Sequence, residues 1–286
     1  MTDLSFYNLR RYFGYSMFNT VLPMTNAQLC LATAGFLILL LLPPSLQAES
    51  AAASRESIAA ADLQNQLEPS EIKPLQAGDQ SFTVLEKPAM TAFTKGTVIL
   101  VPDWSQHAAS PRMINVLREQ LVDYGWNTMS IMVPEPLVET TAETIVSYQS
   151  ELLLRLQAVM KSAENNTGSI IVVAQGSSGA LINQLYQTDQ LTPPEGLILL
   201  GAYLPDKTLN QAVSLALAKH KVPTLDLQQQ HDNSFVMASS QLRLQLVRKH
   251  IKEIYRQRLL PGSFDQPQNQ QWVFNEVYGW LSYLGF

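Results

Sequence analysis

Residues 170–181 read IIVVAQGSSGAL, and this stretch decides the fold. Its first half is an apolar, β-branched run, and the small residues of Gly176–Gly179 follow it at once. A short apolar run that ends in turn residues is typical of a strand buried on both faces of a parallel sheet. The stretch therefore predicts a buried strand, then a sharp turn made of small residues, then a helix.

The same alternation of short apolar runs and longer helical patterns continues on both sides of this stretch. The predicted strands are Phe82–Leu85, Thr97–Val101, Thr128–Val133, Ser169–Ala174, Gly196–Leu200, Val222–Leu227 and Ile254–Leu260. The predicted helices are Pro111–Tyr124, Ala142–Ala163, Gly179–Gln187, Thr208–Ala218, Ser239–Lys252 and Trp272–Tyr283. This order predicts a doubly wound α/β domain over residues 81–286, with a mostly parallel sheet and helices on both faces.

The N-terminal part of the chain has the features of an export signal. Residues 29–42, LCLATAGFLILLLL, form an uncharged apolar run of 14 residues, which is short for a membrane-spanning helix. The basic pair Arg10-Arg11 precedes the run, Pro43-Pro44 ends it, and the small residue Ala48 suits a cleavage site. We expect residues 1–48 to be a signal peptide and the protein to be periplasmic. The alternative is an uncleaved anchor in the inner membrane through the same run.

Residues 49–80 are rich in Ala, Ser, Glu and Gln and contain few large apolar side chains. We expect a flexible leader there, with some helix over residues 51–67, before the domain that begins at residue 81.

Composition narrows the function classes. The chain has 19 Lys and Arg against 24 Asp and Glu, a formal net charge of −5, and this balance offers no reason to bind nucleic acid. Its single cysteine, Cys30, lies in the apolar run and is lost if that run is cleaved, which excludes a disulfide framework and a catalytic thiol. No metal-ligand spacing and no glycine motif for phosphate or dinucleotide binding is present, so we expect no metal and no cofactor.

From about residue 95 to its end the chain resembles an α/β-hydrolase, because a strand, a sharp small-residue turn and a helix are the setting of the nucleophile elbow in that fold. More narrowly, it resembles an uncharacterised family of exported Gram-negative proteins with a hydrolase-like core. The narrower resemblance is carried by Val98–Pro102, Gly125-Trp126, Val222–Asp226, His231–Asn233, Tyr255–Gln257 and Gly279–Leu281. The resemblance implies an α/β-hydrolase-like fold, and the narrower family carries over no established activity.

The elbow of a hydrolase reads small-x-Ser-x-small, and the stretch 174–180 fits that pattern imperfectly. Counted from the end of the strand, Gly176 stands where the nucleophile belongs, and a glycine cannot attack a substrate. A slip of two residues would place Ser178 there, and Ser177 is a third option. We favour a structural turn and helix cap, with Gly176 at a positive φ, over a nucleophile.

The other two members of a hydrolase triad follow later strands. Asp232 comes after the strand that ends at Leu227, in the place of the acid, although an Asx-type turn explains it equally well. The base should follow the last strand, but the loop Leu260–Gln266 contains no histidine. Only His107 and His231 remain as a relocated base.

Three functions remain open. The first is a periplasmic hydrolase-fold protein without a standard triad, which binds a small molecule or a cell-envelope component. The second is a serine esterase with a rearranged triad of Ser178 or Ser177, Asp232, and His231 or His107. The third is an envelope structural protein that is tethered to the membrane by its uncleaved N-terminal segment and contacts the membrane only there. The basic concentration in residues 243–258 predicts a solvated helix face or, as the alternative, a contact with anionic lipid or polymer.

Overall fold

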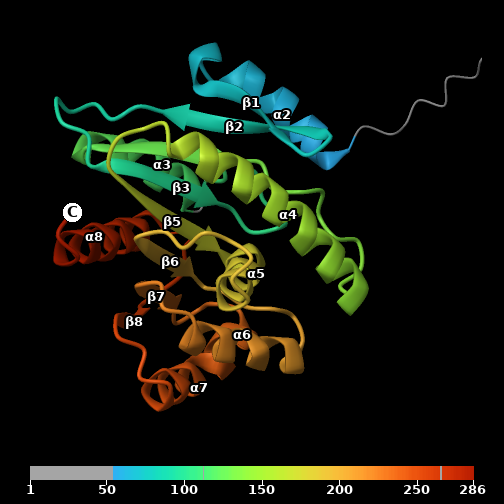
Figure 1. Ribbon diagram of the computed structural model, residues 1–286, viewed down its shortest axis with the longest axis vertical. Coiled ribbons are helices and arrows are strands. Elements are labelled where there is room, and N and C mark those ends of the chain that lie inside the picture. Colours follow the sequence, from blue (N-terminus) through green and yellow to red (C-terminus); the bar gives the residue numbers. More distant parts are fainter. Residues whose placement is uncertain (1–53, 112, 265) are drawn as a thin grey trace, which may run out of the picture. The chain divides into compact units, whose positions relative to one another are not determined.

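A computed structural model of the chain describes residues 54–111, 113–264 and 266–286 (Figure 1). The predicted signal segment 1–48, with its apolar run and Cys30, lies outside these residues. In the part that is described, no helix has both the length and the apolar character that crossing a bilayer requires.

The described residues form one mostly parallel sheet. Its eight strands lie in the order β1-β2-β4-β3-β5-β6-β7-β8. The strands are β1 (Ile72–Ala77), β2 (Gln80–Lys87), β3 (Gly96–Val101), β4 (Trp126–Ile131), β5 (Ser169–Gln175), β6 (Gly196–Leu200), β7 (Thr224–Gln229) and β8 (Tyr255–Leu260). Strand β2 runs antiparallel to both of its neighbours, β1 and β4, and every other pair in the sheet is parallel. This arrangement confirms the predicted fold class.

Helices cover both faces of the sheet (Figure 1). They are α2 (Arg55–Gln66), α3 (Ile114–Gln120), α4 (Ala142–Ala163), α5 (Gly176–Gln187), α6 (Lys207–Lys219), α7 (Ser234–Lys249) and α8 (Pro267–Tyr283). Side chains of α3 and α8 form one apolar core with the sheet, and side chains of α4, α5 and α6 form the other. Because both faces are covered, all the residues of β3 and β6 are buried, which is why these strands read as continuous apolar runs.

Three predicted helices begin at least three residues earlier in the structure than their apolar pattern suggests, and the first is α5, which begins at Gly176 and not at Gly179. Helix α7 begins at Ser234 and not at Ser239, because the side chain of Asn233 caps it by accepting a hydrogen bond from the backbone N–H of Phe235 at 2.9 Å. Helix α8 begins at Pro267, a residue suited to the first turn, and not at Trp272.

The structure differs from the expected leader over residues 49–80, of which residues 54–80 are described. Helix α2 buries Leu63 against the sheet, and Glu56 of this helix forms an ion pair with Arg155 at 2.6 Å. Strand β1 pairs with β2 along its whole length. An edge strand is held by backbone hydrogen bonds, and β1 leaves five of its six residues exposed or partly exposed, so it lacks the apolar pattern by which the inner strands are found.

Candidate functional site

The turn between β5 and α5 is built around Gly176. Its φ is +55°, in the left-handed region, which confirms the prediction for this residue. A Cβ atom at this position would lie 2.2 Å from Oδ1 of Asp103. Gly176, the residue predicted to stand at the nucleophile position, therefore has neither a side chain nor room for one.

The space above Gly176 is filled by the carboxylate of Asp103, from the loop that follows β3. Its Oδ1 accepts a hydrogen bond from the backbone N–H of Ser177 at 2.6 Å, and its Oδ2 accepts one from the hydroxyl of Ser105 at 2.8 Å. Burial raises the pKa of the Asp103 carboxyl, and the hydrogen bond from Ser177 opposes that shift. In a hydrolase the N–H after the nucleophile binds the oxyanion of the substrate, and here a carboxylate of the chain itself accepts from that N–H.

Ser177 and Ser178, the candidate nucleophiles, lie in the first turn of α5 and are fully buried. Neither hydroxyl oxygen has a hydrogen-bond partner within the described residues. The hydroxyl of Ser178 lies beside the phenol of Tyr148, whose pKa is raised by burial. The structure thus brings neither serine into hydrogen-bond contact with an imidazole.

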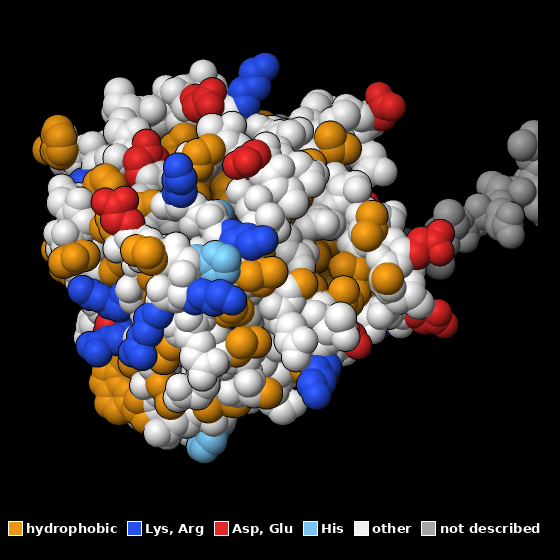
Figure 2. Space-filling view, turned by 60° about the horizontal axis from the view of Figure 1, so that its bottom comes forward, with side chains coloured by type: hydrophobic (Ala, Val, Ile, Leu, Met, Phe, Trp, Pro, Cys, Tyr) orange, Lys and Arg blue, Asp and Glu red, His pale blue; other side chains and the backbone are white. Residues whose placement is uncertain are grey.

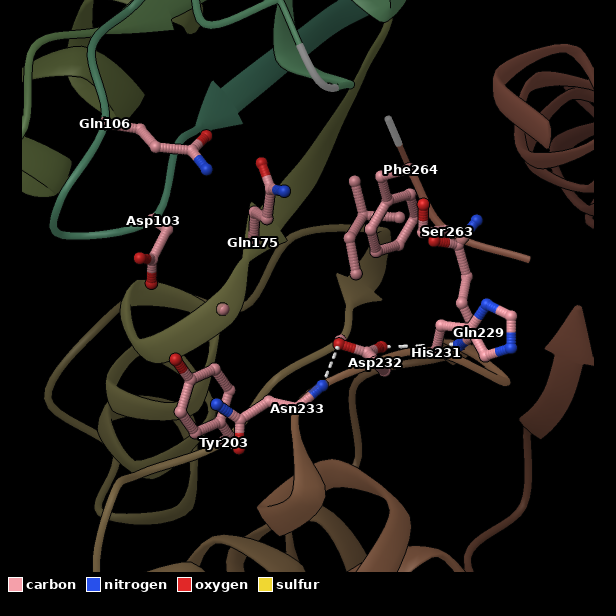
Figure 3. Close-up of a pocket in the computed structure, with 13 residues that line it drawn as sticks. Asp103, Gln106, Gln175, Tyr203, Gln229, His231, Asp232, Asn233, Ser263 and Phe264 are labelled. Atoms are coloured by element: carbon pink, nitrogen blue, oxygen red, sulfur yellow. Dashed lines mark hydrogen bonds between the residues drawn. The ribbon is translucent and has the colours of Figure 1, made fainter. Parts of the chain in front are cut away.

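A cavity of about 300 Å³ opens at the carboxyl ends of β3, β5, β6, β7 and β8 (Figure 3). This is where ligands bind in open parallel sheets. The lining residues are Asp103, Gln106, Gln175, Gly176, Leu200, Gly201, Tyr203, Gln229, His231, Asp232, Asn233, Ser263 and Phe264. The cavity therefore contains two of the predicted site residues, Asp232 and His231, and is bordered by the elbow glycine.

Asp232 lines the cavity and also accepts hydrogen bonds from the backbone of its own loop. Its Oδ1 accepts from the backbone N–H of Asn233 at 2.9 Å, and its Oδ2 accepts from that of Gln229 at 3.3 Å. The carboxylate also covers Gly201, whose φ is +57° and whose Cβ would lie 2.6 Å from Oδ2. Burial raises the pKa of the Asp232 carboxyl. Asp103 over Gly176 and Asp232 over Gly201 thus repeat one arrangement on two neighbouring strands.

The two candidate bases lie apart from the serines. His231 is exposed at the rim of the cavity, where Figure 3 places it on the opposite side from Asp103, and its backbone N–H donates to the carbonyl of Gly262 at 3.1 Å. His107 lines a second cavity of about 120 Å³, together with Arg55 and Glu56 of α2. Burial lowers the pKa of the His107 imidazole.

The histidine-free loop after β8 contributes Ser263 and Phe264 to the cavity. No hydrogen bond joins Asp232 to a histidine side chain within the described residues. The structure therefore brings Asp232 and His231 to one cavity and leaves Ser177, Ser178 and His107 out of it.

The sequence reasoning missed several residues that line the cavity, above all Gln175 and Gln229. Each is the last residue of its strand and is itself buried, Gln175 at 6% and Gln229 at 1% exposure. A polar residue at the carboxyl end of an apolar run was the signal that could have found them, because that end of a parallel sheet is where sites form. Within the described residues, Oε1 of Gln175 and both amide atoms of Gln229 lack a hydrogen-bond partner.

The basic residues of the stretch 243–258 are largely engaged within the fold. Arg243 is fully buried and pairs with Asp226 at 3.0 Å, while the partly exposed Arg258 pairs with Glu276 at 3.1 Å. Lys252 donates to the backbone carbonyl of Leu217 at 2.8 Å. The solvated helix face predicted for the whole stretch is therefore wrong for Arg243. Figure 2, which turns the lower part of Figure 1 forward, shows Lys and Arg side chains interspersed with hydrophobic and uncharged ones.

A family model described as "Protein of unknown function (DUF3530)" matches residues 42–151 and 139–283. Comparison with curated proteins finds no match. In the described residues, no group of three or more His, Cys, Asp or Glu side chains is placed so that it could hold a metal ion.

Among solved structures, the fold is similar to that of esterase 2 from Thermogutta terrifontis phosphoramylated by tabun, with a TM-score of 0.59, 14% identity, and coverage of 77% of this chain and 97% of the other. The structure of Est1E from Butyrivibrio proteoclasticus with ferulic acid bound has a TM-score of 0.58, 12% identity, and coverage of 74% of this chain and 98% of the other. A dienelactone hydrolase from Anabaena variabilis has a TM-score of 0.57, 14% identity, and coverage of 74% and 96%. At these identities the similarity shows an α/β-hydrolase-like fold.

Proposed function

This chain belongs to the DUF3530 family of proteins of unknown function, and we propose that it is a hydrolase-fold protein that binds a ligand and has no serine triad. One observation carries the proposal. The carboxylate of Asp103 fills the position above Gly176 and accepts the hydrogen bond of the Ser177 N–H. It thereby occupies both the place of a nucleophile and part of the place of an oxyanion.

The chemistry of serine supports this function. A serine hydroxyl attacks at neutral pH only when a base takes its proton, and general-base assistance contributes about 10²–10⁴-fold. Ser177 and Ser178 are buried without a partner in the described residues, and neither lines the cavity. A substrate oxygen at the Ser177 N–H would also have to displace a buried carboxylate, and two negative charges there would repel each other.

We propose that the cavity at the strand ends is the binding site and that the protein works in the periplasm. The apolar run 29–42 and the small residue Ala48 support export, with cleavage after Ala48. Intact-mass measurement on the native protein should find a chain that starts at Glu49. A full-length product in the membrane fraction would support the inner-membrane anchor instead.

A fluorophosphonate probe tests the central part of the proposal, because it labels serines that a base activates. We expect no labelling of the purified protein and turnover of short-chain esters at the background rate. The variant Ser178→Ala should behave like the parent in both assays.

The opposing result is labelling at Ser178 or Ser177, with ester turnover that is lost in Ser178→Ala and in His231→Ala or His107→Ala. That outcome would establish a rearranged hydrolase and overturn the proposal. A serine esterase of known activity, run in parallel, confirms that the probe reacts under the same conditions.

A further inference from the structure

The cavity at the strand ends contains buried amide groups that the fold itself does not use. Gln229 is 1% exposed, and neither its Oε1 nor its Nε2 has a hydrogen-bond partner within the described residues. Oε1 of Gln175, which also lines the cavity, is likewise buried and without a partner within the described residues. Buried polar atoms are nearly always paired, so these atoms indicate a ligand that offers both donors and acceptors.

The charges of the lining exclude an anionic ligand. Asp103 and Asp232 both line the cavity, and neither lysine nor arginine is among the described residues that do so. A phosphate or carboxylate group would therefore meet two carboxyl groups without a cation to balance it.

A cationic ligand is not required either, because the chain already provides hydrogen bonds to both carboxylates. Asp103 accepts from the Ser177 N–H and the Ser105 hydroxyl, and Asp232 accepts from the N–H groups of Gln229 and Asn233. Each oxygen retains a further lone pair for a neutral donor such as a hydroxyl group.

The remaining lining fits an alcohol-rich ring. Amide side chains come from Gln106, Gln175, Gln229 and Asn233, a phenol from Tyr203, and an apolar ring from Phe264 (Figure 3). A hydroxyl group donates and accepts at the same time, so a row of hydroxyls can satisfy amides and carboxylates together. The volume of about 300 Å³ is at the lower end of the range for small-molecule sites, which suits a single ring.

We propose that this cavity binds an uncharged, hydroxyl-rich ligand of the size of one sugar ring, held by the side-chain amides of Gln229 and Gln175. The inference rests on the proposed binding function and names the ligand class of the same site. Gln229 should contribute most to ligand binding, because both polar atoms of its side-chain amide are buried and have no partner within the described residues.

Saturation-transfer NMR with the purified full chain, in a detergent that carries no sugar headgroup, tests the proposal. The probes are glucose and N-acetylglucosamine as neutral rings, glucuronate as an anionic ring and glucosamine as a cationic one. We expect at least one neutral ring to bind, and glucuronate to bind at least tenfold more weakly than glucose. Gln229→Met keeps the side-chain volume and removes the amide, and it should lower the affinity for the neutral ring at least tenfold.

Gln245→Met is the matched control, because Gln245 is exposed on α7, and it should leave the affinity unchanged. The ligand class is overturned if glucuronate or glucosamine binds more tightly than both neutral rings, if none of the four binds, or if Gln229→Met leaves the affinity unchanged. Fluorophosphonate labelling of a serine would instead overturn the proposed function. The two failures are thus read in separate assays.

Discussion

Gln228 and Gln229 are neighbours at the end of β7, and both are buried, at 0% and 1% exposure. Successive residues of a strand point to opposite faces of the sheet, so the two amides enter different surroundings. Nε2 of Gln228 donates to Oδ2 of Asp226 at 3.1 Å, and its Oε1 accepts from Nε2 of Gln257 at 3.2 Å. The side-chain amide of Gln229, which lines the cavity, has no hydrogen-bond partner among the described residues.

This difference separates a structural polar cluster from a candidate binding site. Asp226, the centre of the first cluster, accepts hydrogen bonds from Arg243 at 3.0 Å, from Tyr255 at 2.9 Å and from Gln228. Of the buried polar atoms in this cluster, Nε of Arg243 lacks a partner within the described residues, while the Asp226 carboxylate and the Gln228 amide are paired. Such pairing stabilises the fold and leaves little for a ligand to bind. The cavity side keeps unpaired amides, which lower stability and are typical of sites where function overrides local stability.

The largest effect should come from breaking the centre of the paired cluster. Asp226→Ala leaves the guanidinium of Arg243 buried without its counter-charge, and we expect it to lower the free energy of unfolding by about 3–5 kcal/mol. Urea unfolding measures this difference. Glu276→Ala removes an ion pair whose Arg258 is half exposed, and it should lower stability by less than about 1 kcal/mol. Equal effects of the two substitutions would contradict the distinction.

On the cavity side, the next largest effect should be at the elbow. Gly176→Ala forces a positive φ on a residue with a side chain, which lowers stability by roughly 1–3 kcal/mol, and its Cβ meets the carboxylate of Asp103. Adding Asp103→Ala should recover the part of the loss that comes from this contact. Gly279→Ala, in the open middle of α8, should instead gain up to about 1 kcal/mol. If Gly176→Ala left the stability unchanged in thermal and urea unfolding, that result would refute the tight contact with Asp103.

The two neighbouring glutamines test the comparison directly. Gln228→Met leaves Gln257 and an oxygen of Asp226 with one partner fewer, and we expect a loss of about 1–3 kcal/mol. Gln229→Met removes an unpaired buried amide, and we expect a gain of about 1 kcal/mol in the absence of ligand. Urea unfolding of both variants in one buffer should therefore give opposite signs. A loss in both would show that Gln229 is structural.

The smallest effect should be a pH dependence that comes from Asp103. Its pKa is raised in the folded protein by burial, so above the usual value of 3.8 the folded chain still holds a proton that the unfolded chain has lost. Stability from this group is therefore lost as the pH rises through that window, with a slope of at most about 1.4 kcal/mol per pH unit.

Asp103→Asn does not titrate, so its stability relative to the parent should increase as the pH rises through the same window and stay constant above it. Urea unfolding at a series of pH values follows this difference. A difference that decreases with rising pH would show that the carboxylate is stabilised, and not destabilised, by its surroundings.

Much of the fold could be predicted because the sheet is covered on both faces. Helix Ala142–Ala163 and strand Gly196–Leu200 are found with the boundaries expected from their apolar patterns. Strand β1 could not be found in this way, since an edge strand depends on backbone pairing with β2, which leaves no pattern in its side chains.

The candidate site was predictable only in part. The turn at Gly176 followed from small residues at the end of an apolar run, which is a local feature of the chain. The contact between Asp103 and the N–H of Ser177 joins residues that are 74 positions apart, and nothing local to either residue indicates it. Asp232 was predicted from its place after a strand, and its hydrogen bonds to Gln229 and Asn233 fit the Asx-turn alternative as well as a cavity residue.

The sequence by itself determined the alternation of strands and helices along the chain from β2 onward and the sharp turn at Gly176, because burial on two faces and the freedom of glycine at positive φ are properties of short stretches of chain. It did not determine which polar residues are paired. Gln228 and Gln229 are identical residues at adjacent positions. Only the tertiary structure places the side chain of Gln228 beside Asp226 and Gln257 and that of Gln229 at the cavity. Hydrogen-bond partners on strands far apart in the sequence meet only when the sheet is assembled, and that assembly decides which buried amides remain for a ligand.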